Sequence, residues 1–106
     1  MGKGRYYVLD DEGNPTPASY ELWLEWIDFP RDLHVADDRV GELRVSTVFL
    51  GVDHGIGPAP MIYETMIFID DDMSDIYMER YSTREEAIEG HKRALVIAAE
   101  YKGGGE

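Results

Sequence analysis

The sequence contains no cysteine, so a disulfide framework, a thiolate metal site and a cysteine nucleophile are all excluded. It also lacks any apolar run near the roughly 18 residues that a membrane-spanning helix needs. The basic residues at 1–5 are not followed by the apolar stretch of a signal peptide. Together these absences predict a soluble cytoplasmic protein.

Basic residues are scarce. The chain has 10 lysines and arginines against 22 aspartates and glutamates, a formal net charge of −12. Affinity for DNA or RNA phosphate depends on clustered lysine and arginine, so direct nucleic-acid binding is disfavoured, as is an anionic membrane surface. Simple solubility explains such a charge. It also suits a protein partner with a basic surface, including one whose nucleic-acid groove this chain would occupy by mimicry.

A length of 106 residues fits one domain, and an apolar fraction of 43% is ordinary for a globular protein. We expect residues 1–102 to form a single domain and 103–106 a flexible glycine-rich tail. The residue patterns predict an α+β fold, an antiparallel sheet centred on a long β-hairpin with helices packed on one face. The predicted strands are 5–9, 33–36, 42–53, 61–69 and 76–80, and the predicted helices are 17–28 and 83–101.

The segment 17–28 fits two kinds of structure. Thr16 followed by Pro17 is typical of a helix N-cap and first turn, and apolar residues recur at helical spacing behind them. The alternation of residues 22–26 also suits a strand. The cap favours a helix, which ends before Pro30.

The hairpin follows from two segments of high strand propensity, 42–53 and 61–69, joined by a loop rich in glycine and proline. The acidic turn after the second strand lacks the glycine and glutamate that a calcium loop needs at its sixth and twelfth positions. We therefore interpret its carboxylates as an acidic surface, formed by Asp70, Asp71, Asp72 and Asp75.

The last helix carries a capping box, either Ser82 with Glu85 or Thr83 with Glu86. His91 lies in the middle of its apolar stripe. The neighbouring glycine, at position 90, costs about 1 kcal/mol of helix stability relative to alanine, which indicates the close approach of another backbone there.

Histidines and carboxylates are the candidates for chemistry. Asp53 and His54 are adjacent, so on a strand they point to opposite faces, and the register of the hairpin decides which of them shares a face with Glu64. One hypothesis places these three residues and His91 around a metal or a substrate, with His54, Glu64 and His91 as weak metal candidates. The simpler hypothesis is a buried His91 that pairs with Glu64 or a main-chain carbonyl and fixes the helix to the sheet.

No local pattern supports catalysis. Histidine spacing typical of a metal site is absent, the glycines of 51–57 do not precede a helix as a phosphate loop would, and Ser46 and Thr47 have no neighbouring general base. We predict no cofactor and favour a protein that is not an enzyme.

Several segments spread over most of the chain resemble a family of small bacteriophage and prophage proteins. They are 5–10 (RYYVLD), 13–15 (GNP), 44–54 (RVSTVFLGVDH), 57–60 (GPAP), 63–68 (YETMIF), 79–83 (ERYST), 85–87 (EEA) and 90–91 (GH). The resemblance implies a phage origin, and hence the host cytoplasm, but no mechanism. The acidic turn at 70–75 departs from the glycine-rich loop more usual in the family. The polar residues that the resemblance singles out are Asp53, His54, Glu64, Thr65, Arg80 and His91.

These observations favour a small acidic phage-type accessory protein that acts by binding a host or phage protein. Two alternatives stay open. One is a histidine–carboxylate site for a metal or small ligand, with or without hydrolysis. The other is a structural homo-oligomer, such as a dimer formed through the open sheet face or an exposed strand edge.

Overall fold

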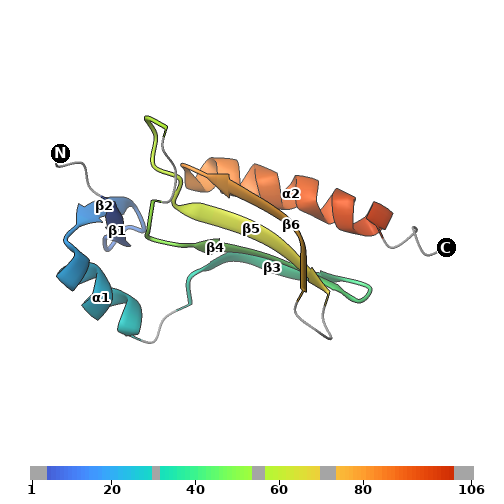
Figure 1. The fold of residues 1–106 in the computed structure, drawn as a ribbon, viewed down its shortest axis with the longest axis horizontal. Helices are drawn as coiled ribbons and strands as arrows, with labels where there is room; N and C mark the ends of the chain where they lie inside the picture. The colour runs from blue at the N-terminus through green and yellow to red at the C-terminus, as the bar shows by residue number, and fades with distance from the viewer. Residues whose placement is uncertain (1–4, 30–31, 54–56, 70–73, 102–106) are drawn as a thin grey trace.

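The computed structural model describes residues 5–29, 32–53, 57–69 and 74–101, and it has the α+β fold that the sequence predicts (Figure 1). The tail predicted at 103–106 lies outside the described residues. No helix among the described residues is long and apolar enough to cross a membrane. In chain order the elements are β1 (Tyr6–Leu9), β2 (Pro15–Ala18), α1 (Tyr20–Asp28), β3 (His34–Val40), β4 (Leu43–Phe49), β5 (Tyr63–Ile69), β6 (Ser74–Tyr81) and α2 (Arg84–Tyr101).

Strands β3 to β6 form one antiparallel sheet in the order β3-β4-β5-β6. The predicted hairpin is its centre, because β4 pairs with β5 from Leu43 opposite Ile69 to Phe49 opposite Tyr63. Strand β4 ends at Phe49, four residues before the predicted end, and its hairpin partner begins two residues later than predicted. Asp53 therefore lies beyond the paired strands.

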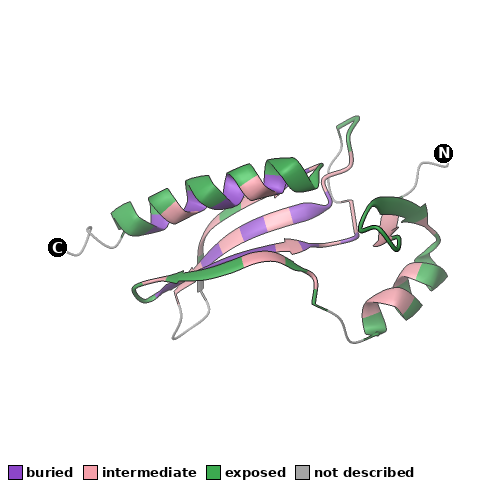
Figure 2. Ribbon diagram, turned by 180° about the vertical axis from the view of Figure 1, so that it is seen from behind, coloured by how far each residue is buried: buried purple, intermediate pink, exposed green. Residues whose placement is uncertain are grey.

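Helix α2 runs along one face of this sheet and buries the core (Figure 2). Because side chains alternate across a strand, every second residue of β4 and β5 faces the helix. The helix approaches closely because its buried positions are small apart from one histidine. The buried residues of α2 are Ala87, Gly90, His91, Ala94 and Ala98, and they pack over the buried apolar strand residues Leu43, Val45, Phe49, Tyr63, Ile67 and Tyr81.

The predicted capping box at the start of α2 is the Thr83–Glu86 version. The Thr83 hydroxyl accepts a hydrogen bond from the Glu86 amide at 3.0 Å. The Glu86 carboxylate in turn accepts from the Ser82 amide at 3.1 Å. The Glu86 amide, which has no helical partner in the first turn, and the amide of Ser82 just before the helix are thereby satisfied.

Helix α1 begins at Tyr20, three residues later than predicted, and the cap assigned to Thr16 was wrong. Residues 15–18 instead form strand β2, which pairs with β1 along the N-terminal hairpin. A proline fits there because β2 is an edge strand, where a missing amide donor breaks no ladder. Ser19 caps the helix, its hydroxyl accepting from the Leu22 amide at 3.0 Å.

The elements β1, β2 and α1 form an N-terminal unit, within which α1 contacts β1. This unit lies at one end of the four-stranded sheet (Figure 1). Backbone hydrogen bonds join this unit to the chain after β4. The Tyr7 amide donates to the Gly51 carbonyl at 2.8 Å, and the Asp53 amide donates to the Arg5 carbonyl at 2.9 Å. Gly51 has φ of +77°, a backbone conformation that favours glycine.

Candidate functional site

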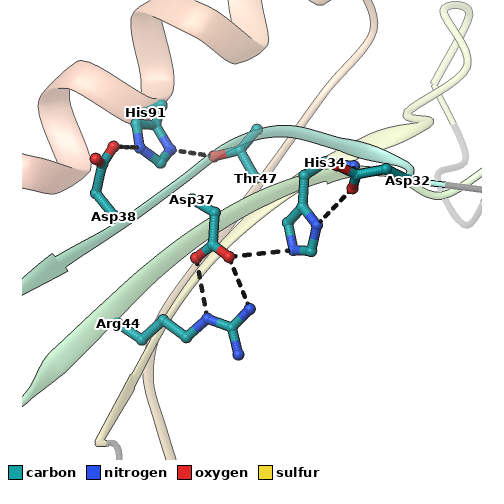
Figure 3. Close-up of polar contacts among 7 residues, drawn as sticks. All are labelled: Asp32, His34, Asp37, Asp38, Arg44, Thr47 and His91. Carbon is teal, nitrogen blue, oxygen red and sulfur yellow. Dashed lines mark hydrogen bonds and ion pairs between the residues drawn. The ribbon is translucent and has the colours of Figure 1, made fainter.

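A hydrogen-bonded chain of polar side chains links α2 to the sheet, and Figure 3 shows its members Asp38, His91 and Thr47. His91 Nε2 lies 2.8 Å from Asp38 Oδ2, and His91 Nδ1 lies 2.7 Å from Thr47 Oγ1. The hydroxyls of Thr47 and Thr65 are 2.5 Å apart. The Tyr81 hydroxyl, on β6, donates instead to Glu79 Oε1 at 3.3 Å. We call Asp38, His91, Thr47 and Thr65 the buried network.

The sheet register explains why these residues meet. Thr47 and Thr65 are directly opposite each other on β4 and β5, and Asp38 lies on β3 opposite Val45. All three side chains therefore point to the face that α2 covers. A carboxylate only accepts hydrogen bonds, so Nε2 of His91 carries the proton and donates to Asp38. In the neutral imidazole, Nδ1 then accepts from the Thr47 hydroxyl.

The order carboxylate, imidazole, hydroxyl is also found in nucleophilic catalysts, but here the Thr47 hydroxyl is buried away from solvent. Thr47 and Thr65 are 0% exposed, and the His91 side chain is 5% exposed. Solvent reaches the buried network at Asp38, whose side chain is 52% exposed. No substrate can approach Thr47 in this arrangement. The network satisfies its own donors and acceptors and joins α2 to the sheet. The partners of His91 are Asp38 and Thr47, whereas the simpler hypothesis named Glu64 or a main-chain carbonyl.

The structure separates the residues that the sequence singled out. Thr65 and His91 lie together on the α2 face. Glu64 and Arg80 pair on the opposite face, with Arg80 Nε 3.0 Å from Glu64 Oε2, so the expected Glu64–His91 contact is wrong. Alternation along β5 causes this, since Glu64 and Thr65 are neighbours on one strand. The Asp53 carboxylate accepts from the Met61 amide at 3.0 Å.

His54, together with Asp70, Asp71 and Asp72 of the predicted acidic surface, lies outside the described residues, while Asp75 is exposed on β6. Because β4 ends at Phe49, the question of which neighbour shares a face with Glu64 concerns residues beyond the paired strands. Within the described ranges no three histidine, aspartate or glutamate side chains are grouped so that they could hold a metal ion.

A second polar cluster, which sequence reasoning missed, lies between β6 and α2. Glu79 accepts hydrogen bonds from the Tyr77 hydroxyl at 2.7 Å and from Arg93 Nη2 at 3.3 Å. Burial raises the pKa of Tyr77 to about 12, and the hydrogen bond to Glu79 adds to this effect. Burial would also raise the pKa of Glu79, but the hydrogen bonds from Tyr77 and Arg93 outweigh it and lower that pKa. Its carboxylate is therefore already paired.

The sheet face opposite α2 carries surface ion pairs. Arg44 binds Asp37 through two hydrogen bonds of 3.0 and 2.8 Å, and these lower the pKa of Asp37 despite partial burial (Figure 3). The hydrogen bond from the His34 amide lowers the pKa of Asp32, and the His34 side chain adds to this effect, with Nδ1 3.0 Å from Asp32 Oδ1. The carboxylates of Asp32 and Asp37 are thus both paired within the protein.

None of the residues of helix α1 is buried, although most of them are apolar (Figure 2). Trp26 makes an edge contact with Phe49, with ring centroids 5.8 Å apart, and Trp23 packs on Tyr6 at 5.3 Å. The Trp23 indole Nε1 is a buried polar atom without a hydrogen-bond partner among the described residues. The attachment of α1 is therefore partial. Tyr20, Leu22 and Leu24 remain exposed.

No protein-family model, curated protein or solved structure matches this chain.

Proposed function

We propose that this protein acts by binding another protein, with α1 as its contact surface. The observation that carries the proposal is a nine-residue helix, six of whose residues are apolar or aromatic, in which no residue is buried. In a folded domain an amphipathic helix ordinarily buries its apolar stripe. An apolar surface that the protein itself covers only in part suits a second molecule.

The exposed apolar side chains concentrate in this one region. Among the described residues eight large apolar side chains are exposed, and four of them lie within residues 20–29. Their exposed fractions are 49% for Tyr20, 49% for Leu22, 42% for Leu24 and 66% for Phe29. Such clustering is typical of recognition surfaces, whereas single exposed apolar residues are ordinary.

Catalysis and edge-to-edge assembly have less support. The buried network is sealed and satisfied, so it offers no reacting group to a ligand. Both free edges of the sheet carry features that discourage strand pairing. Strand β3 has a register shift after His34 and a charged centre at 37–39, and β6 has a register shift near Ile76 and the charged pair Glu79 and Arg80.

The resemblance to phage and prophage proteins supports a setting in which the partner is a phage or host protein. The net charge of −12 favours a partner with a basic surface. We interpret the chain as a small accessory protein of this kind, located where its partner is, in the host cytoplasm.

Affinity capture at moderate salt with tagged full-length protein tests the proposal. The test variant is Leu22→Ser/Leu24→Ser, and the matched control is Val96→Ser/Ile97→Ser, which changes two exposed apolar residues of α2. We expect the wild type and the control to retain the same partner and the α1 variant to lose it. Capture of no partner, or equal capture by both variants, would overturn the proposal.

A further inference from the structure

We propose that the surface bound by α1 is a groove in which lysine or arginine lies beside apolar residues, so that α1 acts as an acidic recognition helix. This inference rests on the proposed function and names the chemistry of the partner. It follows from where the charged and apolar residues lie around the helix axis and from the absence of any basic residue in the helix.

Successive residues of a helix are turned by about 100°, which places the residues of α1 in sectors. Trp23, Trp26 and Ile27 form the sector that packs on the protein, and all three are half-buried. Leu22 lies at one margin of that sector and Leu24 at the other, both exposed. The helix therefore presents two apolar margins to solvent.

The outermost sector of α1, between those two margins, is acidic. Glu21, Glu25 and Asp28 are all exposed and fall within about 60° of one another on the helix. Tyr20 extends the margin of Leu24, and Phe29, just past the helix end, continues that of Leu22. A ridge of carboxylates with an apolar margin on each side is the result.

This arrangement specifies the partner by complementarity. Three carboxylates on a helix that contains no lysine or arginine repel an anionic membrane and a second acidic copy of this chain. They favour a basic strip, and the two margins favour apolar walls beside it. The net charge of −12 also steers a basic partner during approach. The mode is that of an amphipathic helix seated in a groove.

The protein carries its own reporter for this test, since its 2 tryptophans are Trp23 and Trp26, both in α1. We would titrate the full chain with an amphipathic helical peptide of leucine and lysine and follow tryptophan emission. Polylysine supplies charge alone, and a leucine–glutamine peptide of the same pattern supplies apolar contact alone. We expect a saturable blue shift with leucine–lysine and at least about tenfold weaker binding of both other probes.

Variants separate the apolar contribution of the α1 surface to binding from the contribution of its charge. Leu22→Ser/Leu24→Ser and Glu21→Gln/Glu25→Gln should each weaken leucine–lysine binding by about tenfold, and only the glutamine variant should flatten its salt dependence. Glu42→Gln/Glu100→Gln makes the same charge change at exposed sites away from α1 and should bind as the wild type does. An unchanged emission maximum in each free variant shows that α1 keeps its packing.

Several outcomes would overturn the inference. They are equal binding of polylysine, equal binding of the leucine–glutamine peptide, binding to neutral vesicles that exceeds peptide binding, and a dimer mass by light scattering that Leu22→Ser/Leu24→Ser abolishes. In affinity capture, loss of the partner by the serine variant with full retention by Glu21→Gln/Glu25→Gln would leave the proposed function standing and reject the acidic recognition helix. Retention by the serine variant rejects the proposed function itself.

Discussion

The two helices that the structure describes differ in how much of their surface they bury. Helix α2 is rich in charge, yet it buries five residues, four of them alanine or glycine, because small side chains let its backbone approach the sheet. Helix α1 carries two tryptophans and two leucines and buries none of them, because little of the protein lies against it. Burial is thus decided by what an element faces, and hydrophobic content alone does not predict it.

The largest expected change in stability comes from a substitution in the buried face of α2. His91→Ala removes a side chain that bonds Asp38 and Thr47 and leaves a cavity beneath α2. We expect the free energy of unfolding to fall by about 3 to 4 kcal/mol, from lost packing and an unsatisfied Thr47 hydroxyl. Chemical denaturation measures this loss.

Leu24→Ala in α1 is the matched change, since it truncates an exposed side chain that is 42% accessible. It should cost less than about 0.5 kcal/mol. Equal losses for the two variants would show that α1 is packed as tightly as α2 and would remove the contrast between the helices.

Gly51→Ala tests how the N-terminal unit is attached. A Cβ at this position would lie 2.6 Å from Trp23 Nε1 and 2.8 Å from the Tyr7 carbonyl oxygen, and φ of +77° is unfavourable for alanine. We expect a loss of about 2 to 3 kcal/mol, from backbone strain and steric overlap.

This loss should be local to the N-terminal unit. Tryptophan emission should shift to the red and amide exchange should rise in α1, while α2 keeps its protection. Gly13→Ala, at a positive-φ glycine of the β1–β2 turn with open space around it, separates backbone strain from overlap. A uniform loss of protection in both helices would contradict the weak coupling inferred for the two regions.

Gly90→Ala tests how closely α2 packs on the sheet. Alanine ordinarily stabilises a helix by about 1 kcal/mol relative to glycine. At this position, however, its Cβ would overlap the ring of Tyr81. We expect a net loss of about 1 to 2 kcal/mol, measured by denaturation, because the overlap costs more than the helix gains. A gain in stability would show that Tyr81 can move aside freely.

Gly90 also illustrates what could be foreseen from the sequence. The glycine correctly indicated close approach, but the approaching group is the Tyr81 side chain where a backbone was expected. The hairpin and the terminal helix were predictable because their signals are local, as alternation and a capping box are. Strand β2 was missed because Thr16 and Pro17 fit the start of a helix equally well.

The partners of the polar residues could not be foreseen, because they depend on register between distant segments. Glu64 was expected to need a partner. That partner is Arg80 on the next strand, whereas His91 was expected. Asp38 gave no local signal, since it lies in a polar stretch and meets a histidine 53 residues away. Such contacts become predictable only when the strand order and the helix position are known.

The last prediction is a dependence of stability on high pH, which belongs to the α2 half of the molecule. Burial and the hydrogen bond to Glu79 raise the pKa of Tyr77 to about 12, above the value of about 10 for an unfolded tyrosine. The folded state therefore holds this proton more tightly. Its contribution to stability is complete below pH of about 10 and is lost as the pH rises towards 12. We expect Tyr77→Phe to reduce the slope of stability against pH in this range, measured by denaturation at stepped pH. An unchanged slope would mean that the Tyr77–Glu79 contact does not persist. The packing between β6 and α2 would then be as incomplete as the packing of α1 on β1.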